Sequence, residues 1–278
     1  MAYAFDPTWA AELDRIHGIE ATWDTTTIGR LEILGLGEGE SFLEIGAGAG
    51  SIARWAASQV GPAGEVVATD LDTRFLQDLP PDISVLQHDI RSDSLPHDHF
   101  DVVHARLVLS HLAERDAVLA RAARACRPGG HLVIEEFDES DTLGGSMRRP
   151  HVNSAWAEEA LLQCWPAMGA FVATFGYDAA YGSRLAESLA DCGLDQVQTA
   201  GNVAILHGAT PQSAAYRTSL AFLGRAMTRN GLLTDEQLNP VLALLDDPDF
   251  AMATPVLVTA WGRRPHSPAP QPPIPQHS

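Results

Sequence analysis

The chain has 278 residues, 45% hydrophobic and 19% charged, which is typical of a globular protein of one or two domains. Its formal net charge is −18, from 36 acidic and 18 basic residues, and a surface of this sign repels phosphate backbones and anionic lipids. We therefore expect neither nucleic acid nor a membrane as a partner.

The cysteines and the hydropathy pattern favour a soluble, cytoplasmic protein. Cys126, Cys164 and Cys192 lack the spacing of a zinc site or a redox motif, so we interpret them as reduced thiols. No apolar run reaches the ~18 residues that a membrane span needs. The N-terminus also lacks the basic-then-apolar order of a signal peptide.

Residues 7–34 have helical periodicity. Apolar side chains recur every three or four positions, at Leu13, Ile16, Ile19 and Trp23. Asp24 is a good N-cap, so a second helical piece is predicted to begin there. We expect residues 1–40 to form a helical segment that covers a ligand site.

The next hundred residues alternate between strand and helix patterns. Strands are predicted at 42–45, 65–70, 83–87, 100–105 and 131–136, and helices at 51–60, 72–79 and 106–127. This alternation predicts an α/β fold with a largely parallel sheet covered on both faces.

Beyond residue 138 the rhythm changes. An aromatic-rich segment covers 152–177, a helix is predicted at 185–192, and a sixth strand at 196–206. A second helical insertion follows at 211–245, and a last strand at 252–262. The proline-rich tail, residues 265–278, is predicted to be disordered.

The first predicted strand leads into a glycine loop. Residues 42–51 read F-L-E-I-G-A-G-A-G-S, with glycines at positions that allow a sharp turn and close approach to a ligand. The N-terminus of the helix that follows points at this loop, and a helix N-terminus favours anionic or polar groups. A strand, a glycine loop and a helix form the usual opening of a nucleotide-binding sheet.

Five motifs in order identify a family. They are Glu44-x-Gly46-x-Gly48-x-Gly50, Asp70 ending the second strand, Asp89 after the third, Phe100-Asp101-Val102-Val103, and Arg127-Pro128-Gly129-Gly130-His131-Leu132-Val133-Ile134. With these the chain resembles the class I S-adenosylmethionine-dependent methyltransferases of the small-molecule type. The resemblance implies a Rossmann-like, seven-stranded, mostly parallel sheet with an antiparallel last strand. The methyltransferase domain would cover residues 41–264, with helical lid insertions at about 140–180 and 208–248.

The resemblance also implies S-adenosylmethionine as cofactor and a set of residues around it. Glu44 would face its ammonium group, Asp70 the ribose hydroxyls, and Asp89 the adenine amino group. The remaining expected contacts are Gly46, Ala47, Gly48 and Gly50 along the methionine portion, Leu71 and Ile90 at the adenine, and Ala105 and Arg106 on the sulfonium side. Asp70 follows the last glycine by 20 residues, the spacing at which a second-strand acid reaches a ribose. The alternative is that Asp70 and Asp89 only cap the helices after their strands.

Methyl transfer from a sulfonium is an in-line displacement that needs no metal, and it needs a base only when the acceptor is a hydroxyl or an acidic carbon. The candidate catalytic residues are His111, after the fourth strand, and Glu136, after the fifth. A structural histidine and a solvated or arginine-paired acid are the alternatives. Aromatic and methionine side chains in the two insertions would roof an apolar cavity. They are Trp156, Trp165, Met168, Phe171, Phe175, Tyr177, Tyr181, Tyr216, Phe222 and Met227.

The leading hypothesis is methyl transfer to a small, largely apolar molecule, such as a secondary metabolite or a quinone-like compound. A second hypothesis is a cofactor-binding protein of this fold that catalyses a cyclisation or rearrangement without methylation. A third is an NAD-dependent oxidoreductase, disfavoured because Ser51 replaces the third glycine of the dinucleotide motif and Glu44 would repel a pyrophosphate. The acceptor atom and the oligomeric state, including a homodimer, stay open.

Overall fold

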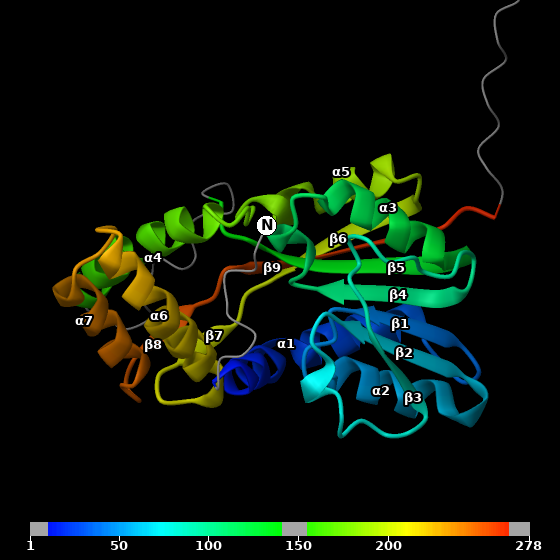
Figure 1. The fold of residues 1–278 in the computed structure, drawn as a ribbon, viewed down its shortest axis with the longest axis horizontal. Coiled ribbons are helices and arrows are strands. Elements are labelled where there is room, and N and C mark those ends of the chain that lie inside the picture. Colours follow the sequence, from blue (N-terminus) through cyan, green and yellow to red (C-terminus); the bar gives the residue numbers. More distant parts are fainter. Residues whose placement is uncertain (1–10, 141–154, 267–278) are drawn as a thin grey trace, which may run out of the picture.

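The computed structural model describes residues 11–140 and 155–266, and a seven-stranded sheet forms its centre (Figure 1). The strand order is β3-β2-β1-β4-β5-β9-β6. The strands are β1 (Ser41–Ile45), β2 (Glu65–Asp70), β3 (Ile83–Gln87), β4 (Phe100–Arg106), β5 (Cys126–Asp138), β6 (Asp195–Asn202) and β9 (Val256–Arg263). β9 pairs antiparallel with both β5 and β6, whereas the first five strands run parallel. The predicted sheet, with its antiparallel last strand, is therefore confirmed.

Helices cover both faces of this sheet, as the alternation of patterns predicts. On one face α3 (Arg115–Ala125) and α5 (Tyr181–Asp191) bury Leu119 and Leu185 against Leu43. On the other face α2 (Ser51–Val60) and the end of α1 (Glu12–Leu34) bury Ile52 and Leu31 against Phe42. Figure 1 shows α3 and α5 on the side of the sheet opposite α1 and α2.

α1 is one continuous helix, so the predicted break at Asp24 is wrong. Asp24 does not cap a helix, because its carboxylate accepts a hydrogen bond from Arg106 of β4 at 2.8 Å. The helix ends at Gly35, whose φ of 85° is left-handed and whose N–H bonds back to the carbonyls of Leu31 and Glu32. The predicted helical residues before 11 lie outside the described residues.

The segment between β4 and α3 is not a single helix either. Leu107 has a φ of 57°, and a short 3-10 turn, Leu109–His111, precedes α3. A helix was also predicted at 72–79, where the structure has only a 3-10 turn, Thr73–Phe75.

A second layer of helices extends from the carboxyl side of the sheet. It consists of α4 (Ala155–Ala173), α6 (Pro211–Arg229) and α7 (Asp235–Leu245), with a two-stranded sheet of β7 (Ile205–His207) and β8 (Ala251–Ala253). These elements have a core of their own, which includes Leu161, Leu220 and Val241. We refer to this layer as the helical roof. The predicted sixth strand is divided into β6 and β7, and the predicted last strand into β8 and β9, so that each runs from the main sheet into the roof. Ala204 and Thr254 exchange hydrogen bonds at the point where the two strands change sheets.

α1 joins the roof to the sheet, and it crosses α6 at a glycine. A β-carbon on Gly18 would lie 2.6 Å from the Ala215 β-carbon and 2.7 Å from the Pro211 carbonyl oxygen. A β-carbon on Gly29, in the same helix, would meet no atom within 4 Å, so this position provides a matched control.

We expect Gly18→Val to lower the free energy of unfolding by about 1–3 kcal/mol, because the crossing has no space for a side chain. Gly29→Ala should raise it by up to about 1 kcal/mol through helix propensity. Urea denaturation of both variants checks this. Equal effects of the two substitutions would show that the crossing is not tightly packed.

Candidate active site

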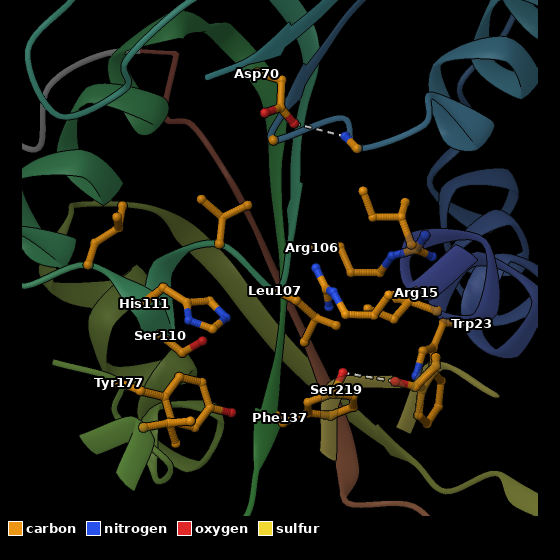
Figure 2. Close-up of a pocket in the computed structure, with 18 of the residues that line it drawn as sticks. Arg15, Trp23, Asp70, Arg106, Leu107, Ser110, His111, Phe137, Tyr177 and Ser219 are labelled. Atoms are coloured by element: carbon orange, nitrogen blue, oxygen red, sulfur yellow. Dashed lines mark hydrogen bonds between the residues drawn. The ribbon is translucent and has the colours of Figure 1, made fainter. Parts of the chain in front are cut away.

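A cavity of about 890 Å³ lies between the carboxyl ends of the strands and the helical roof. Its walls come from β1, β2, β4 and β5 and from α1, α4 and α6. In Figure 2 Asp70 lies at one end, Phe137 and Tyr177 lie at the other, and Leu107 and His111 lie between them. The volume suits a cofactor together with a small substrate.

The glycine loop forms one wall of the cavity. Gly46, Ala47 and Gly48 line it, and Gly46 and Gly48 have φ values of 70° and 61°. A β-carbon on Gly46 would lie 2.4 Å from Cγ2 of Val108, so only glycine fits there. The N–H groups of Gly46 and Ala47 donate to the Thr69 carbonyl, at 2.8 and 3.0 Å. The N–H groups of Gly46 and Ala47 are therefore already engaged, and the loop contributes a backbone surface that a ligand can approach closely.

Gly50, also predicted as a cofactor contact, does not line the cavity. It begins α2 with a φ of 80°, and a β-carbon there would lie 2.9 Å from the Leu79 methyl carbons. Behind it, the N–H of Ser51 donates to the Glu20 carboxylate of α1 at 3.3 Å. The N-terminus of α2 is thus already in contact with an anion of this chain.

Glu44 lies at the end of a buried ionic network. Its Oε1 is 3.8 Å from Nδ1 of His104, whose Nε2 is 3.4 Å from Oε2 of Glu135. Burial opposes protonation of His104, but the two carboxylates outweigh it and raise its pKa. Glu135 also accepts hydrogen bonds from Thr27 of α1 and Thr259 of β9. Glu44 lines the cavity, and its buried Oε2 has no hydrogen-bond partner within the described residues.

Two further acids, Asp70 and Asp89, line the cavity beyond the glycine loop. Asp70 accepts hydrogen bonds from the N–H groups of Gly48 and Asp72, at 2.9 and 3.0 Å, and burial raises its pKa. Asp89 forms an ion pair with Arg91 at 2.7 Å, and this hydrogen-bonded partner lowers its pKa to about 2. Each therefore makes local contacts while presenting an edge to the cavity. The predicted neighbours Leu71 and Ile90 also line it.

Ala105 and Arg106 were both expected beside the sulfonium. Ala105 is fully buried in the core and does not line the cavity. Arg106 lines it, but its guanidinium donates to Thr27 at 2.9 Å and Asp24 at 2.8 Å and so fastens α1 to β4.

The two candidate bases differ in position. His111 lines the cavity with its ring 4.9 Å from that of Tyr177, and burial, with a smaller effect of Arg15, lowers its pKa to about 4. Glu136 is buried and does not line the cavity, so its predicted catalytic role is not supported. Its Oε1 accepts the N–H groups of Val108 and Leu109, at 3.0 and 2.6 Å, because the turn after β4 needs an acceptor there.

Several cavity residues have no counterpart among the sequence-based candidates. Arg15 and Trp23 of α1 point into the cavity in Figure 2, and Glu139 lines it directly after β5. The sequence offered one indication that Glu139 lies at the site, because it directly follows Asp138 at the end of the fifth strand. Of the predicted roof side chains, Trp165, Met168, Tyr177 and Tyr216 line the cavity, whereas Trp156 is 57% exposed.

Part of the chain is similar to known methyltransferases. A family model described as a methyltransferase domain matches residues 43–134. Methyltransferase str2 of Strobilurus tenacellus is 34% identical over 121 residues, which cover 42% of each chain. The ubiquinone/menaquinone biosynthesis C-methyltransferase of Pseudomonas paraeruginosa is 30% identical over 131 residues, 44% of this chain and 50% of that protein.

The fold agrees with these matches. A Haemonchus contortus phosphoethanolamine N-methyltransferase structure has a TM-score of 0.55 and 15% identity, covering 92% of this chain and 58% of that one. Residues 43–134 thus match a methyltransferase domain, and the fold is that of the class I S-adenosylmethionine-dependent methyltransferases. The sequence matches cover about half the length of the curated relatives.

The residues present fit the cofactor of this methyltransferase family, S-adenosylmethionine. Glu44 lines the cavity and its buried Oε2 has no hydrogen-bond partner within the described residues, which suits an acceptor for an ammonium group. Asp70 presents its carboxylate 20 residues after the glycine loop, and the apolar surfaces of Leu71 and Ile90 lie nearby in the wall. These four residues are the ones we expect to hold the cofactor.

Residues 11–140 and 155–266 contain neither a candidate metal site nor a candidate membrane span. No group of three or more histidine, cysteine or acidic side chains there could hold a metal ion. No helix within the same ranges is long and apolar enough to cross a membrane.

Asp70→Ala should weaken the binding of S-adenosylmethionine by roughly 1–3 kcal/mol, because the ribose hydroxyls would lose charge-assisted hydrogen bonds. Asp78→Ala removes the same charge from an exposed residue outside the cavity and should leave the affinity unchanged. Isothermal titration calorimetry measures both. Equal affinities of the two variants would refute the assignment of the ribose site.

Proposed function

We propose that this chain transfers the methyl group of S-adenosylmethionine to a small, largely apolar organic molecule. The observation that carries the proposal is the continuous cavity of about 890 Å³, which joins the family's cofactor residues to an aromatic roof. A protein that only bound the cofactor would not need the second half of this space.

The cofactor half supports the proposal through its charges. Glu44, Asp70 and Asp89 lie on the same wall and suit the ammonium, ribose and adenine groups respectively. S-adenosylmethionine, when bound, supplies an electrophilic methyl group on a sulfonium. Glu44, Asp70 and Asp89 would hold the cofactor at three points, and alignment of reactants of this kind contributes up to roughly 7–11 kcal/mol to such reactions.

The roof half supports a small apolar acceptor. Its walls include Trp165, Met168 and Val172 of α4 and Leu223 of α6, and α1 closes one side with Trp23. Such walls exclude water, which would otherwise compete with the acceptor for the methyl group. On the side of α1 the roof is closely packed, because α1 crosses α6 at Gly18.

The relatives support the same class of substrate. One is named for a C-methylation in ubiquinone and menaquinone biosynthesis. The matches cover only about half of each relative, so the acceptor of this chain is inferred from its cavity rather than from theirs.

The test is turnover with S-adenosylmethionine labelled in the methyl group and a panel of hydroxy-aromatic and hydroquinone acceptors. We expect label in an organic-extractable product and one S-adenosylhomocysteine released for each methyl transferred. Asp70→Ala should reduce the rate at subsaturating cofactor. An acceptor converted without label would favour a cyclisation or rearrangement, and binding of NADH in place of S-adenosylmethionine would favour an oxidoreductase.

A further inference from the structure

Glu139 is the carboxylate that faces the roof half of the cavity. It follows β5 directly, and its N–H donates to the Ala179 carbonyl at 2.8 Å, which fixes the backbone against the loop before α5. Tyr177, from that same loop, forms a hydrogen bond with the Glu139 side chain. Both residues line the cavity.

Two further residues of the cavity lining, both in the roof, carry polar atoms without a partner in the part of the chain that the structure describes. The rings of Trp165 and Tyr216 meet nearly at right angles, with centroids 6.5 Å apart. The indole nitrogen and the phenol oxygen are buried, belong to residues that line the cavity, and have no hydrogen-bond partner within the described residues. A buried polar atom without a partner destabilises a protein, so two of them in residues that line one cavity indicate a polar group on the ligand.

The surroundings of Glu139 favour a carboxyl group that gains and loses its proton near neutral pH. Burial raises its pKa to about 7; the hydrogen bond from Tyr177 opposes this, and the charge of Asp138 adds to it. The other ionisable groups that line the cavity around it are Tyr216 of α6, His111 of the turn before α3 and Arg15 of α1. Glu136 of β5 lies behind the cavity wall, where its charge acts on Tyr177. Burial also raises the pKa values of Tyr177 and Tyr216, so both stay neutral donors.

The other two candidate bases suit this task less well. A histidine with a pKa of about 4, such as His111, is neutral near pH 7 but a weak proton acceptor. Glu136 uses its Oε1 on two backbone N–H groups and does not reach the cavity. Glu139 is therefore the best placed proton acceptor for a molecule bound under the roof.

We propose that Glu139, with Tyr177, Tyr216 and Trp165, binds the acceptor through an ionisable hydroxyl group, that of a phenol or an enol, and takes its proton. This inference rests on the proposed methyl transfer. The hydroxyl proton passes to a carboxylate oxygen of Glu139. The electron pair left on the acceptor forms the new bond to the methyl group, at oxygen for a phenol and at oxygen or the α-carbon for an enol. The bond from sulfur to the methyl carbon breaks, its electrons return to sulfur to give a thioether, and the proton leaves Glu139 for solvent.

The test measures ligand binding without turnover. The probes are 2-naphthol, 2-methoxynaphthalene and 2-naphthylmethylammonium, titrated by fluorescence between pH 5.5 and 8.5 in the absence of S-adenosylmethionine. The full-length protein is compared with Glu139→Gln and with Glu158→Gln, an exposed roof-helix residue that gives the same change of charge. Thermal unfolding and cofactor titration of each variant confirm that the fold and the cofactor half are intact.

We expect the affinity for 2-naphthol to rise through about pH 7, as Glu139 ionises and accepts the hydroxyl proton. Glu139→Gln should remove this pH dependence and weaken binding about tenfold at pH 8, because a charge-assisted hydrogen bond is lost. Glu158→Gln should behave as the parent protein, and 2-methoxynaphthalene should bind all three proteins without pH dependence.

Three results would overturn the inference: failure of 2-naphthol to bind, a pH dependence that survives Glu139→Gln, or a larger effect of that variant on 2-naphthylmethylammonium, which would indicate an amine acceptor. These outcomes are separable from failure of the proposed function. A pH-dependent naphthol site in a protein that transfers no methyl group would refute methyl transfer alone. Labelled turnover unaffected by Glu139→Gln would refute the role of Glu139 alone.

Discussion

The fold depends on the pairing of opposite charges among ionisable side chains that are buried behind the glycine loop. Glu44, His104 and Glu135 are all buried, and an uncompensated charge in such a place costs several kcal/mol. His104 lies between the two carboxylates, so a positive charge on its ring serves both of them. Thr27 and Thr259 complete the coordination of Glu135 and connect the network to α1 and β9. One oxygen of Glu44 is left for the cavity, and the sheet, the N-terminal helix and the cofactor wall therefore share one electrostatic arrangement.

The cofactor half was predictable because each of its parts is encoded locally. The bounds of α2, β2 and β3 agree with the sequence patterns, since α2 stops before Gly61, β2 ends at Asp70 and β3 ends at the polar residue Gln87. Because β1, β2 and β3 are neighbouring parallel strands, their carboxyl ends bring Glu44, Asp70 and Asp89 to the same edge of the sheet. Asp70 lines the cavity because strand position alone determines where it lies.

The errors share a different cause, which is contact between residues far apart in the sequence. Asp24 has the composition of a helix start, but Arg106, on a strand 82 positions later, takes its carboxylate. Glu136 has a plausible catalytic position, yet the turn after β4 uses it as an acceptor. The roof half, with Glu139 at its edge, is assembled from two insertions whose packing against α1 no local pattern specifies. Its chemistry therefore becomes visible only in three dimensions.

The contact between Glu20 and Ser51 has a consequence for discrimination among adenine-containing metabolites. ATP and dinucleotides share the adenosine part of the cofactor but carry phosphates, which in many nucleotide-binding folds rest on the N-terminus of this helix. Here Glu20 holds a carboxylate at that N-terminus, and Glu44 adds a second nearby in the cavity wall. A phosphorylated competitor would have to approach two negative groups of the protein, whereas a ligand with a cationic ammonium and sulfonium is attracted by them. Selection against the abundant nucleotides of a cell is thus built into the first helix.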